Sequence, residues 1–334
     1  MKNARLRSLP VILMNSIDHY IQAATRDNTR RSYRSAIEHY EVVWGGFLPT
    51  TAETVARYLA DHAQVLSANT LKQRLAALAQ WHSDQGFPDP TKAPVVKKVL
   101  KGIKELHPTE EKRAKPLQLD ELSQLIQWID RAIGNAIEND HYQALLTLSR
   151  NKALVLVGFW RGFRSDELCR LEHDFINVTP GEGMRIFLPR SKGDRQNIGQ
   201  YFHVPALSRL CPVAAYQDWI NVGGISYGPI FRSINRWGQL SEHSLNPNSI
   251  VPLLRTIFRQ AGLSDPDSFS SHSLRRGFAT WANAHHWDMK SLMEYVGWKD
   301  IKSAMRYIDQ GDKFAQHKIE SALAISAPKT PETP

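Results

Sequence analysis

Apolar residues recur every three or four positions through the first hundred residues, with polar residues between them. This is the period of a helix with one buried face. Asn28-Thr29 is a candidate cap for the first helix and Gly45-Gly46 ends it, while a capping box from Thr50 to Glu53 opens the second. Four short helices with a basic surface are therefore predicted, with apolar positions at Tyr33–Trp44, Val55–Leu59, Leu71–Trp81 and Val95–Ile103.

The rest of the chain combines helical patterns with one pair of strands. Helical spacing resumes from Leu119 to Ile129 and dominates again from Val251 to about Ala324. Between them, Met184–Leu188 and Tyr201–Val204 are typical of paired strands, joined by the charged turn Pro189–Gln200. The expected fold class is mainly α with a small β-sheet.

A polar, charged segment bounded by prolines separates the two patterns. It reads His-Pro-Thr-Glu-Glu-Lys-Arg-Ala-Lys-Pro over residues 107–116 and is typical of an exposed linker. We expect a helical domain over residues 1–107, a linker over 108–117, a second domain over 118–325 and a flexible tail over 326–334.

The charge balance narrows the choice of partner. The 334 residues include 42 Lys and Arg against 33 Asp and Glu, a formal net charge of +9. This excess is typical of a protein that meets a polyanion, although a merely basic globular protein fits the composition equally well. Basic residues are spread along the chain instead of forming one amphipathic segment, which disfavours a membrane surface.

Several classes of protein lack support in the sequence. No run approaches the roughly 18 apolar residues of a membrane span, and the two cysteines, Cys169 and Cys211, ask for no oxidising compartment. We therefore expect a cytoplasmic protein. Phosphate-binding P-loops, dinucleotide fingerprints, HExxH zinc motifs and GxSxG elbows do not occur, which disfavours the corresponding enzymes.

Two arginines, a glutamate and a histidine form candidate phosphate-binding pairs. Arg164 follows a glycine turn at the start of a predicted helix, and Glu167 lies three residues later on the same face. Far downstream, His272 and Arg275 are also three residues apart. A guanidinium group donates two parallel hydrogen bonds to phosphate oxygens, so these residues suit the binding of a phosphate and its developing charge.

These segments resemble the tyrosine site-specific recombinases, also called the phage integrase family. Gly-Phe-Arg-Ser-Asp-Glu-Leu at 162–168 and His-Ser-Leu-Arg-Arg-Gly at 272–277 are specific in combination. Most members carry a second His at the position of Trp298. The branch that includes Cre recombinase carries a Trp there, as this sequence does. The catalytic set that the resemblance implies is Arg164, Glu167, Lys192, His272, Arg275, Trp298 and Tyr307.

The resemblance also implies a mechanism and an assembly. Tyr307 would attack a DNA phosphodiester and become linked to the 3′-phosphate, with Lys192 protonating the leaving 5′-oxygen and with no cofactor or metal. Two domains would form a C-shaped clamp around duplex DNA in the nucleoid. A homotetramer would act on two sites, each with inverted binding elements around a spacer, and segment Lys313–Ala324 would dock into a neighbouring protomer.

Basic residues of the N-terminal half are the candidate DNA contacts, although a solvated helix face is the ordinary alternative. They are Arg30, Arg31, Arg34, Lys72, Arg74, Lys97, Lys98 and Lys101.

Other interpretations stay open from the residues. Lys192 is an ordinary turn lysine on the simplest alternative, and Tyr295 is a rival to Tyr307, although its apolar neighbours favour a place in the core. Two other functions compete with recombination: a type IB topoisomerase-like relaxase that works as a monomer, and a DNA-binding regulator without catalysis.

Overall fold

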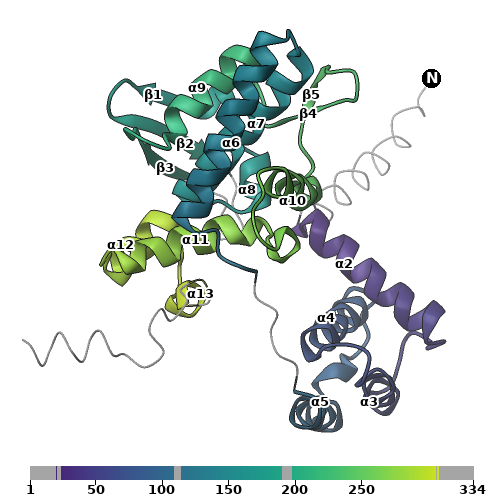
Figure 1. Ribbon diagram of the computed structural model, residues 1–334. Helices are drawn as coiled ribbons and strands as arrows, with labels where there is room; N and C mark the ends of the chain where they lie inside the picture. Colours follow the sequence, from purple (N-terminus) through teal and green to yellow (C-terminus); the bar gives the residue numbers. More distant parts are fainter. Residues whose placement is uncertain (1–19, 21–23, 109–113, 190–197, 306, 308–334) are drawn as a thin grey trace, which may run out of the picture. The chain divides into compact units, whose positions relative to one another are not determined.

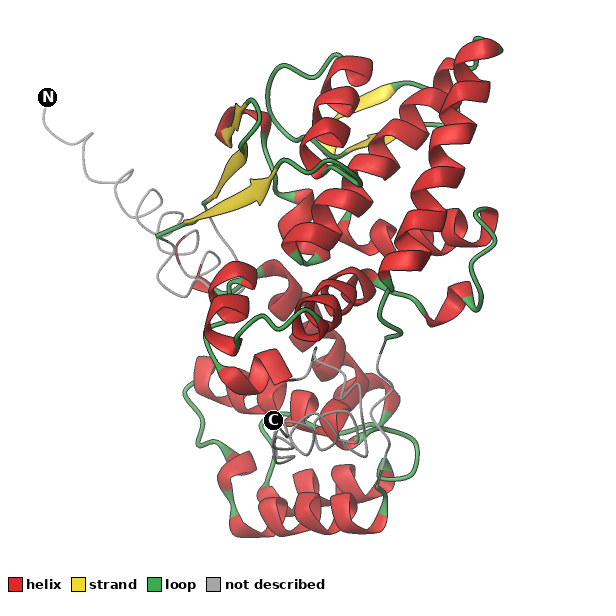
Figure 2. Cartoon of the chain, turned by 60° about the vertical axis from the view of Figure 1, so that its left-hand side comes forward, coloured by secondary structure: helices red, strands yellow, loops and turns green. Residues whose placement is uncertain are grey.

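The computed structural model describes residue 20 and residues 24–108, 114–189, 198–305 and 307. The chain divides into two compact units, Met1–Lys112 and Arg113–Pro334, with separate hydrophobic cores. Most of the described chain is helical and only short segments are strands (Figure 2). This confirms the predicted fold class. In the described ranges, no helix combines the length and apolar character that crossing a bilayer requires.

Unit 1 is a helical bundle around buried aromatic rings. The Tyr40 and Tyr58 rings meet edge to face with their centroids 5.0 Å apart, and both side chains are fully buried. Figure 1 labels its helices α2 (Asp27–Glu38), α3 (Ala52–Asp61), α4 (Ala68–Asp84) and α5 (Pro94–Leu106). The π-helical turn η1 (His39–Val43) follows α2, and the short η2 (Pro90–Lys92) precedes α5.

The predicted start of α3 is wrong by one residue. Thr51 caps the helix, because its hydroxyl accepts a hydrogen bond from the Thr54 backbone N–H at 3.3 Å. Thr50 was the predicted cap, but its hydroxyl accepts from the buried Tyr40 hydroxyl at 2.7 Å instead. A core phenol needs a partner, and the sequence pattern does not show which threonine supplies it.

Unit 2 is built around α7 (Tyr142–Arg161). All nine residues from Ala153 to Arg161 are buried, and a helix buried on every side belongs inside a core. Arg161 is the one charged residue among these nine. The surrounding helices are α6 (Leu119–Glu138), α8 (Ser165–Cys169), α9 (Pro212–Gly223), α10 (Ile250–Gln260), α11 (Ser271–Ala284), α12 (Met289–Val296) and α13 (Ile301–Met305).

Two small antiparallel sheets complete unit 2. The predicted strand pair is present as β2 (Gly183–Leu188) and β3 (Gln200–Pro205), with Met184 opposite Val204. Strands of three to five residues carry too little alternation to be predicted, and the sequence pattern missed three of them: β1 (Ile176–Thr179), which pairs with β2, and the separate pair β4 (Arg232–Ile234) and β5 (Leu240–Ser244).

The first described residues of unit 2 are fastened to α11. Leu117 is fully buried, and its backbone N–H donates to the Ser273 carbonyl at 3.0 Å. A Cβ at Gly277 would lie 2.1 Å from the Leu117 carbonyl oxygen, so only glycine allows this approach. The contact holds the start of α11 in place. Three predicted segments lie outside the described residues: residues 109–113 of the linker, the docking segment 313–324 and the tail at 326–334.

Candidate active site

A glycine turn between α7 and α8 positions Arg164. Gly162 ends α7 in the left-handed conformation, with φ of 60°, which favours glycine over residues with a Cβ. Its carbonyl oxygen accepts a 2.7 Å hydrogen bond from Nη1 of Arg275 on α11. Two residues later Arg164 opens α8 as its N-cap. One turn therefore brings the two predicted phosphate-binding arginines together.

Glu167 holds both arginines through a single buried carboxylate. Its Oε2 accepts from the Arg164 backbone N–H at 2.8 Å, and its Oε1 accepts from Arg164 Nη1 at 2.6 Å. Arg275 Nη1 lies 3.8 Å from Oε2. The Glu167 side chain is only 5% exposed, so this ion pairing takes place away from water. Two guanidinium groups against one carboxylate leave a net positive charge for an anion.

Arg275 carries donors with no partner. Its side chain is 1% exposed, and Nε and Nη2 make no hydrogen bond with any described residue. Burial lowers the pKa of Arg275 to about 10 and the neighbouring Arg164 charge acts in the same direction, while Glu167 and Tyr307 oppose it. Arg275 thus stays charged at neutral pH. Buried, unpaired donors are costly, and a bound anion would satisfy them.

His272, Trp298 and Tyr307 converge on Arg275. The Tyr307 hydroxyl lies 3.1 Å from His272 Nδ1, which is hydrogen-bond distance. The Trp298 and Tyr307 rings stack with centroids 5.4 Å apart and an interplanar angle of 25°. The Arg275 guanidinium carbon lies 5.0 Å from the Trp298 ring and 5.3 Å from the Tyr307 ring. The indole Nε1 of Trp298 is buried and has no partner among the described residues.

Six of the seven predicted catalytic residues thus form one connected cluster, and Lys192 lies outside the described residues. Tyr295 occupies a different environment from Tyr307. Its ring stacks on Phe278 with centroids 5.1 Å apart, and burial raises its pKa, with Arg161 acting against that rise. Tyr295 therefore packs against the core.

One functional candidate was missed in the sequence. Arg161 lies buried beside the cluster, and the signal for it was an arginine at the end of the apolar run Ala153–Trp160.

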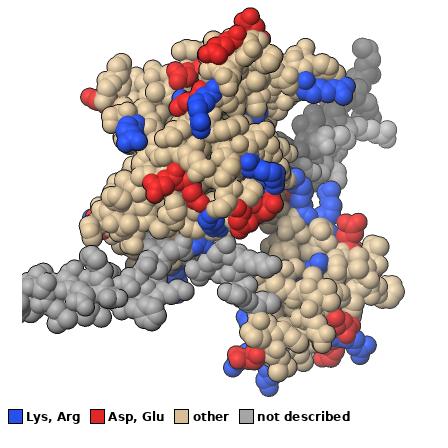
Figure 3. Space-filling view, in the orientation of Figure 1, with Lys and Arg blue, Asp and Glu red and all other residues tan. Residues whose placement is uncertain are grey.

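The predicted DNA contacts of unit 1 differ in their exposure. Arg31, Arg34, Lys72, Lys97, Lys98 and Lys101 are exposed, and Arg30 is partly buried and ion-paired with Asp27. Arg74 differs, because its Nε and Nη1 are buried. Burial raises the pKa of the neighbouring Tyr58, and the charge of Arg74 opposes that rise. On the face that Figure 3 displays, Lys and Arg are interspersed with Asp and Glu.

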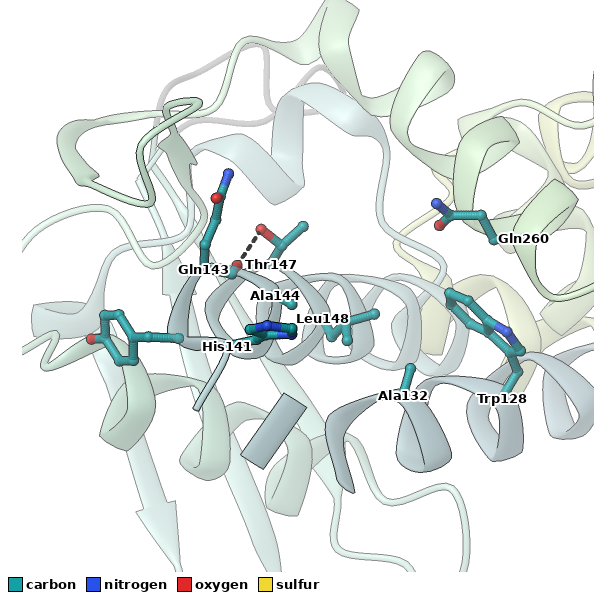
Figure 4. A pocket seen from close by; sticks show the side chains of 9 residues that line it. Trp128, Ala132, His141, Gln143, Ala144, Thr147, Leu148 and Gln260 are labelled. Atoms are coloured by element: carbon teal, nitrogen blue, oxygen red, sulfur yellow. Dashed lines mark hydrogen bonds between the residues drawn. The ribbon is translucent and has the colours of Figure 1, made fainter. Parts of the chain in front are cut away.

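A separate hollow of ≈ 640 Å³ opens between α6, the start of α7 and α10. Trp128, His141, Thr147 and Gln260 are among its lining residues (Figure 4). Arg164 follows the opposite end of α7, and twenty helical residues span about 30 Å. The hollow is therefore distinct from the arginine cluster. Within the described ranges, no three His, Cys, Asp or Glu side chains gather as a metal site requires.

Two of the known proteins with similar sequences are named as recombinases. The chain is 29% identical over 329 residues to an integrase/recombinase XerD homologue from Selenomonas ruminantium, covering 96% of this chain and 92% of the relative. It is 24% identical over 276 residues to recombinase Cre of Escherichia phage P1, covering 78% and 77%.

Solved structures share the fold. The XerH site-specific recombinase in its post-cleavage complex with palindromic difH DNA matches with a TM-score of 0.58 and 18% identity, covering 89% of this chain and 79% of that one. A lambda integrase dimer bound to a core site matches with a TM-score of 0.56 and 16% identity, covering 95% and 98%.

The decisive comparison is at the level of the family. Residues 117–313, more than half of the chain, match the phage integrase family, and the match spans Arg164, Glu167, His272, Arg275 and Tyr307. The resemblance seen in the sequence is thereby confirmed. The chain belongs to the phage integrase family, the tyrosine recombinases that cleave and rejoin DNA strands.

Proposed function

We propose that the chain is a site-specific DNA recombinase in which Tyr307 is the nucleophile. The observation that carries this proposal is the position of the Tyr307 hydroxyl, 3.1 Å from His272 Nδ1 and beside Arg275. A phenol is a weak nucleophile at neutral pH because its ordinary pKa is about 10. It needs a nearby base and an electrophile held in line, and this cluster offers both.

The arginines and the indole act on the phosphate. Arg164, Arg275 and Trp298 donate hydrogen bonds to the non-bridging oxygens of the scissile phosphodiester. The unpartnered Nη2 of Arg275 and Nε1 of Trp298 are the donors that become satisfied when the phosphate binds. As Tyr307 attacks, negative charge grows on these oxygens, and donors that are already in place stabilise it without reorganising.

Protons move at two positions in the reaction. His272 Nδ1 accepts the Tyr307 proton while the tyrosyl oxygen–phosphorus bond forms. The bond from phosphorus to the 5′-oxygen breaks, and that oxygen takes a proton from Lys192, the general acid that the family resemblance assigns. The product is a 3′-phosphotyrosyl link and a free 5′-hydroxyl. A 5′-hydroxyl from a second duplex reverses the same step and exchanges the strands.

The partner is double-stranded DNA that carries inverted binding elements around a spacer. The XerH structure contains a palindromic substrate, and the lambda integrase structure contains a dimer on a core site. A two-fold symmetric pair of proteins matches a two-fold symmetric DNA site. On two such sites four copies assemble as a homotetramer, and each copy contacts the duplex with both of its domains. The exposed cations of unit 1 bind DNA phosphates, and the reaction takes place in the nucleoid.

A covalent trapping assay tests the proposed function. The binding site is first selected from random duplexes, and a site with a nick close to the cleavage point is then labelled. Cleavage releases a short piece of the nicked strand, so the adduct cannot be resealed and accumulates. We expect a labelled protein–DNA band that survives denaturation. If no adduct forms on a selected, tightly bound site, the protein acts as a DNA-binding regulator instead. If the monomer relaxes supercoiled DNA, it acts as a topoisomerase-like relaxase instead.

A further inference from the structure

Arg161 is a buried cation that the mechanism above does not use. It is the last residue of α7 and is 4% exposed. Arginine is seldom buried so fully unless a carboxylate pairs with it. Among the described residues Arg161 forms no ion pair, since Glu167 pairs with Arg164 and Arg275. Burial lowers the pKa of Arg161 to about 10.

Two aromatic rings hold the guanidinium of Arg161. Its central carbon lies 4.2 Å from the centroid of the Tyr295 ring on α12 and 4.8 Å from that of the Phe202 ring on β3. A desolvated cation between ring faces is stabilised by their quadrupoles, but the charge itself is not neutralised. Two of its N–H groups, Nε and Nη1, are buried without a partner in the described chain. The two rings and a side-chain hydrogen bond with Tyr295 fix Arg161. Both partners are uncharged, so they leave its positive charge unbalanced.

The charges around Glu167 do not sum to zero. Arg161, Arg164 and Arg275 carry three positive charges against one carboxylate. The lowered pKa of Arg275 comes mainly from burial and from Arg164, and Arg161 acts in the same direction. An unbalanced charge in a region from which water is excluded acts strongly over several ångströms. Folds tolerate such an arrangement chiefly where an anion will complete it.

We propose that Arg161 is a positioning residue for strand cleavage, whose buried charge makes the site complete only when an anionic phosphodiester is bound. Arg161 does not touch the phosphate. The positive charge of Arg161 offsets part of the negative charge of Glu167. Glu167 therefore neutralises Arg164 and Arg275 less, and these two arginines interact more strongly with the scissile phosphate. This role rests on the proposed function, and it predicts that the effect of Arg161 depends on the charge of the substrate.

Arg161→Met and a matched control, Arg150→Met, test this role. Methionine fills the space between the two rings and removes the charge. Arg150 is also a buried arginine of α7 with a pKa lowered to about 10, but its guanidinium donates to Asn151 Oδ1 at 2.9 Å and to the Arg232 carbonyl at 3.2 Å. Eleven helical residues place it about 16 Å away along α7.

The substrates are nicked suicide duplexes with either a normal phosphodiester or an uncharged methylphosphonate at the scissile position. On the phosphodiester, we expect Arg161→Met to slow single-turnover adduct formation about tenfold. In a Tyr307→Phe background, which cannot cleave, Arg161→Met should also reduce the preference in affinity for the charged over the uncharged duplex. Arg150→Met should leave that preference unchanged, whatever it does to stability.

Arg161→Lys keeps the charge without the flat guanidinium and guards against a neutral variant that fails to fold. It should retain the preference for the charged duplex and lose less rate than Arg161→Met. An unchanged preference in Arg161→Met, or a preference lost in Arg161→Lys as well, would overturn the role of the charge. If the wild-type protein forms no adduct, the proposed function fails instead, so the two failures are distinguishable.

Discussion

The lysines of α5 in unit 1 and the arginine cluster of unit 2 hold their positive charges in opposite ways. In unit 1, Lys97, Lys98 and Lys101 stand exposed along α5. In unit 2, Arg161 and Arg275 are buried and partly without partners. Exposed charges remain hydrated and are screened by salt, so they contribute to affinity at long range. Buried charges are fixed and dehydrated, so they act where charge develops in a transition state.

This difference assigns separate tasks to the units. Changes in unit 1 should alter how tightly and how salt-dependently the protein binds DNA. Changes in the arginine cluster should alter how fast the strand is cleaved once bound, and they should change the stability of the fold, because dehydrating a charge costs free energy.

Removal of the Tyr307 hydroxyl should have the largest effect. Tyr307→Phe keeps the ring that stacks on Trp298 and removes only the attacking oxygen. We expect normal folding and DNA binding with no detectable adduct on a nicked site. Tyr295→Phe is the matched control and should still form an adduct. An adduct from Tyr307→Phe at the wild-type level would assign the nucleophile to another residue.

Neutralising Arg275 should come next in size. Arg275→Met should reduce the single-turnover cleavage rate by about 10²–10³, the usual loss for one donor to a developing oxyanion. Affinity for the uncleaved site should fall much less than the cleavage rate, because the exposed cations of unit 1 are intact. A cleavage rate close to wild type would contradict the assignment of Arg275.

Arg275→Met should also have an unusual effect on stability. Burial places the pKa of Arg275 in the folded protein below its ordinary value, at about 10. The unfolded chain therefore holds this proton more tightly, and below pH 10 the folded state bears the full cost of burying the charge. That cost is relieved as pH rises above 10. A neutral methionine removes it at all pH values, so the melting temperature at pH 7 should equal or exceed that of the wild type.

The shared carboxylate should have an intermediate effect on rate. Glu167→Gln keeps the size of the side chain and an oxygen for the Arg164 backbone N–H, but it leaves the arginines without a counter-charge. We expect cleavage about tenfold slower, from misplaced guanidiniums, and a loss of about 3 kcal/mol in the free energy of unfolding. Asp166→Asn on the same helix is the control, because its partner Arg170 is exposed. Equal stabilities of both variants would count against the buried pairing.

The exposed lysines should have the smallest effect on chemistry. Replacing Lys97, Lys98 and Lys101 with Ala should lower the slope of log affinity against log salt by at most about 0.9 for each lost phosphate contact. The preferred sequence and the cleavage rate at saturating DNA should not change. Lys152→Ala serves as a control, since this lysine is paired with Asp130 at 2.7 Å. An unchanged slope would mean that this face of α5 is only solvated.

Much of the candidate site could be predicted because several of its functional residues occur in short local motifs. Arg164 with Glu167, and His272 with Arg275, each lie three residues apart on one helix. Their spacing therefore survives folding. The long-range step, which places Tyr307 against His272, came from the family resemblance and could not be derived from periodicity.

Other features depend on tertiary contacts that no local pattern records. Arg161 ends an apolar helix, which does not reveal its role. Only the tertiary packing shows that Glu167 already forms ion pairs with Arg164 and Arg275. The cap of α3 moved from Thr50 to Thr51 because a core tyrosine uses the first threonine. Arg74 resembled an exposed DNA contact, yet its guanidinium is partly buried. Lys192 stays a prediction.

The chemical identity of the covalent link tests the account most directly. The trapped protein–DNA adduct can be digested with nuclease and trypsin and its peptides sequenced by mass spectrometry. Cleavage at basic residues places Tyr307 in the peptide Tyr307–Lys313 and Tyr295 in the peptide Ser291–Lys299, so the two candidates are separated. The account predicts a nucleotide joined through its 3′-phosphate to the Tyr307 oxygen. The same modification on Tyr295, or on any other residue, would contradict it.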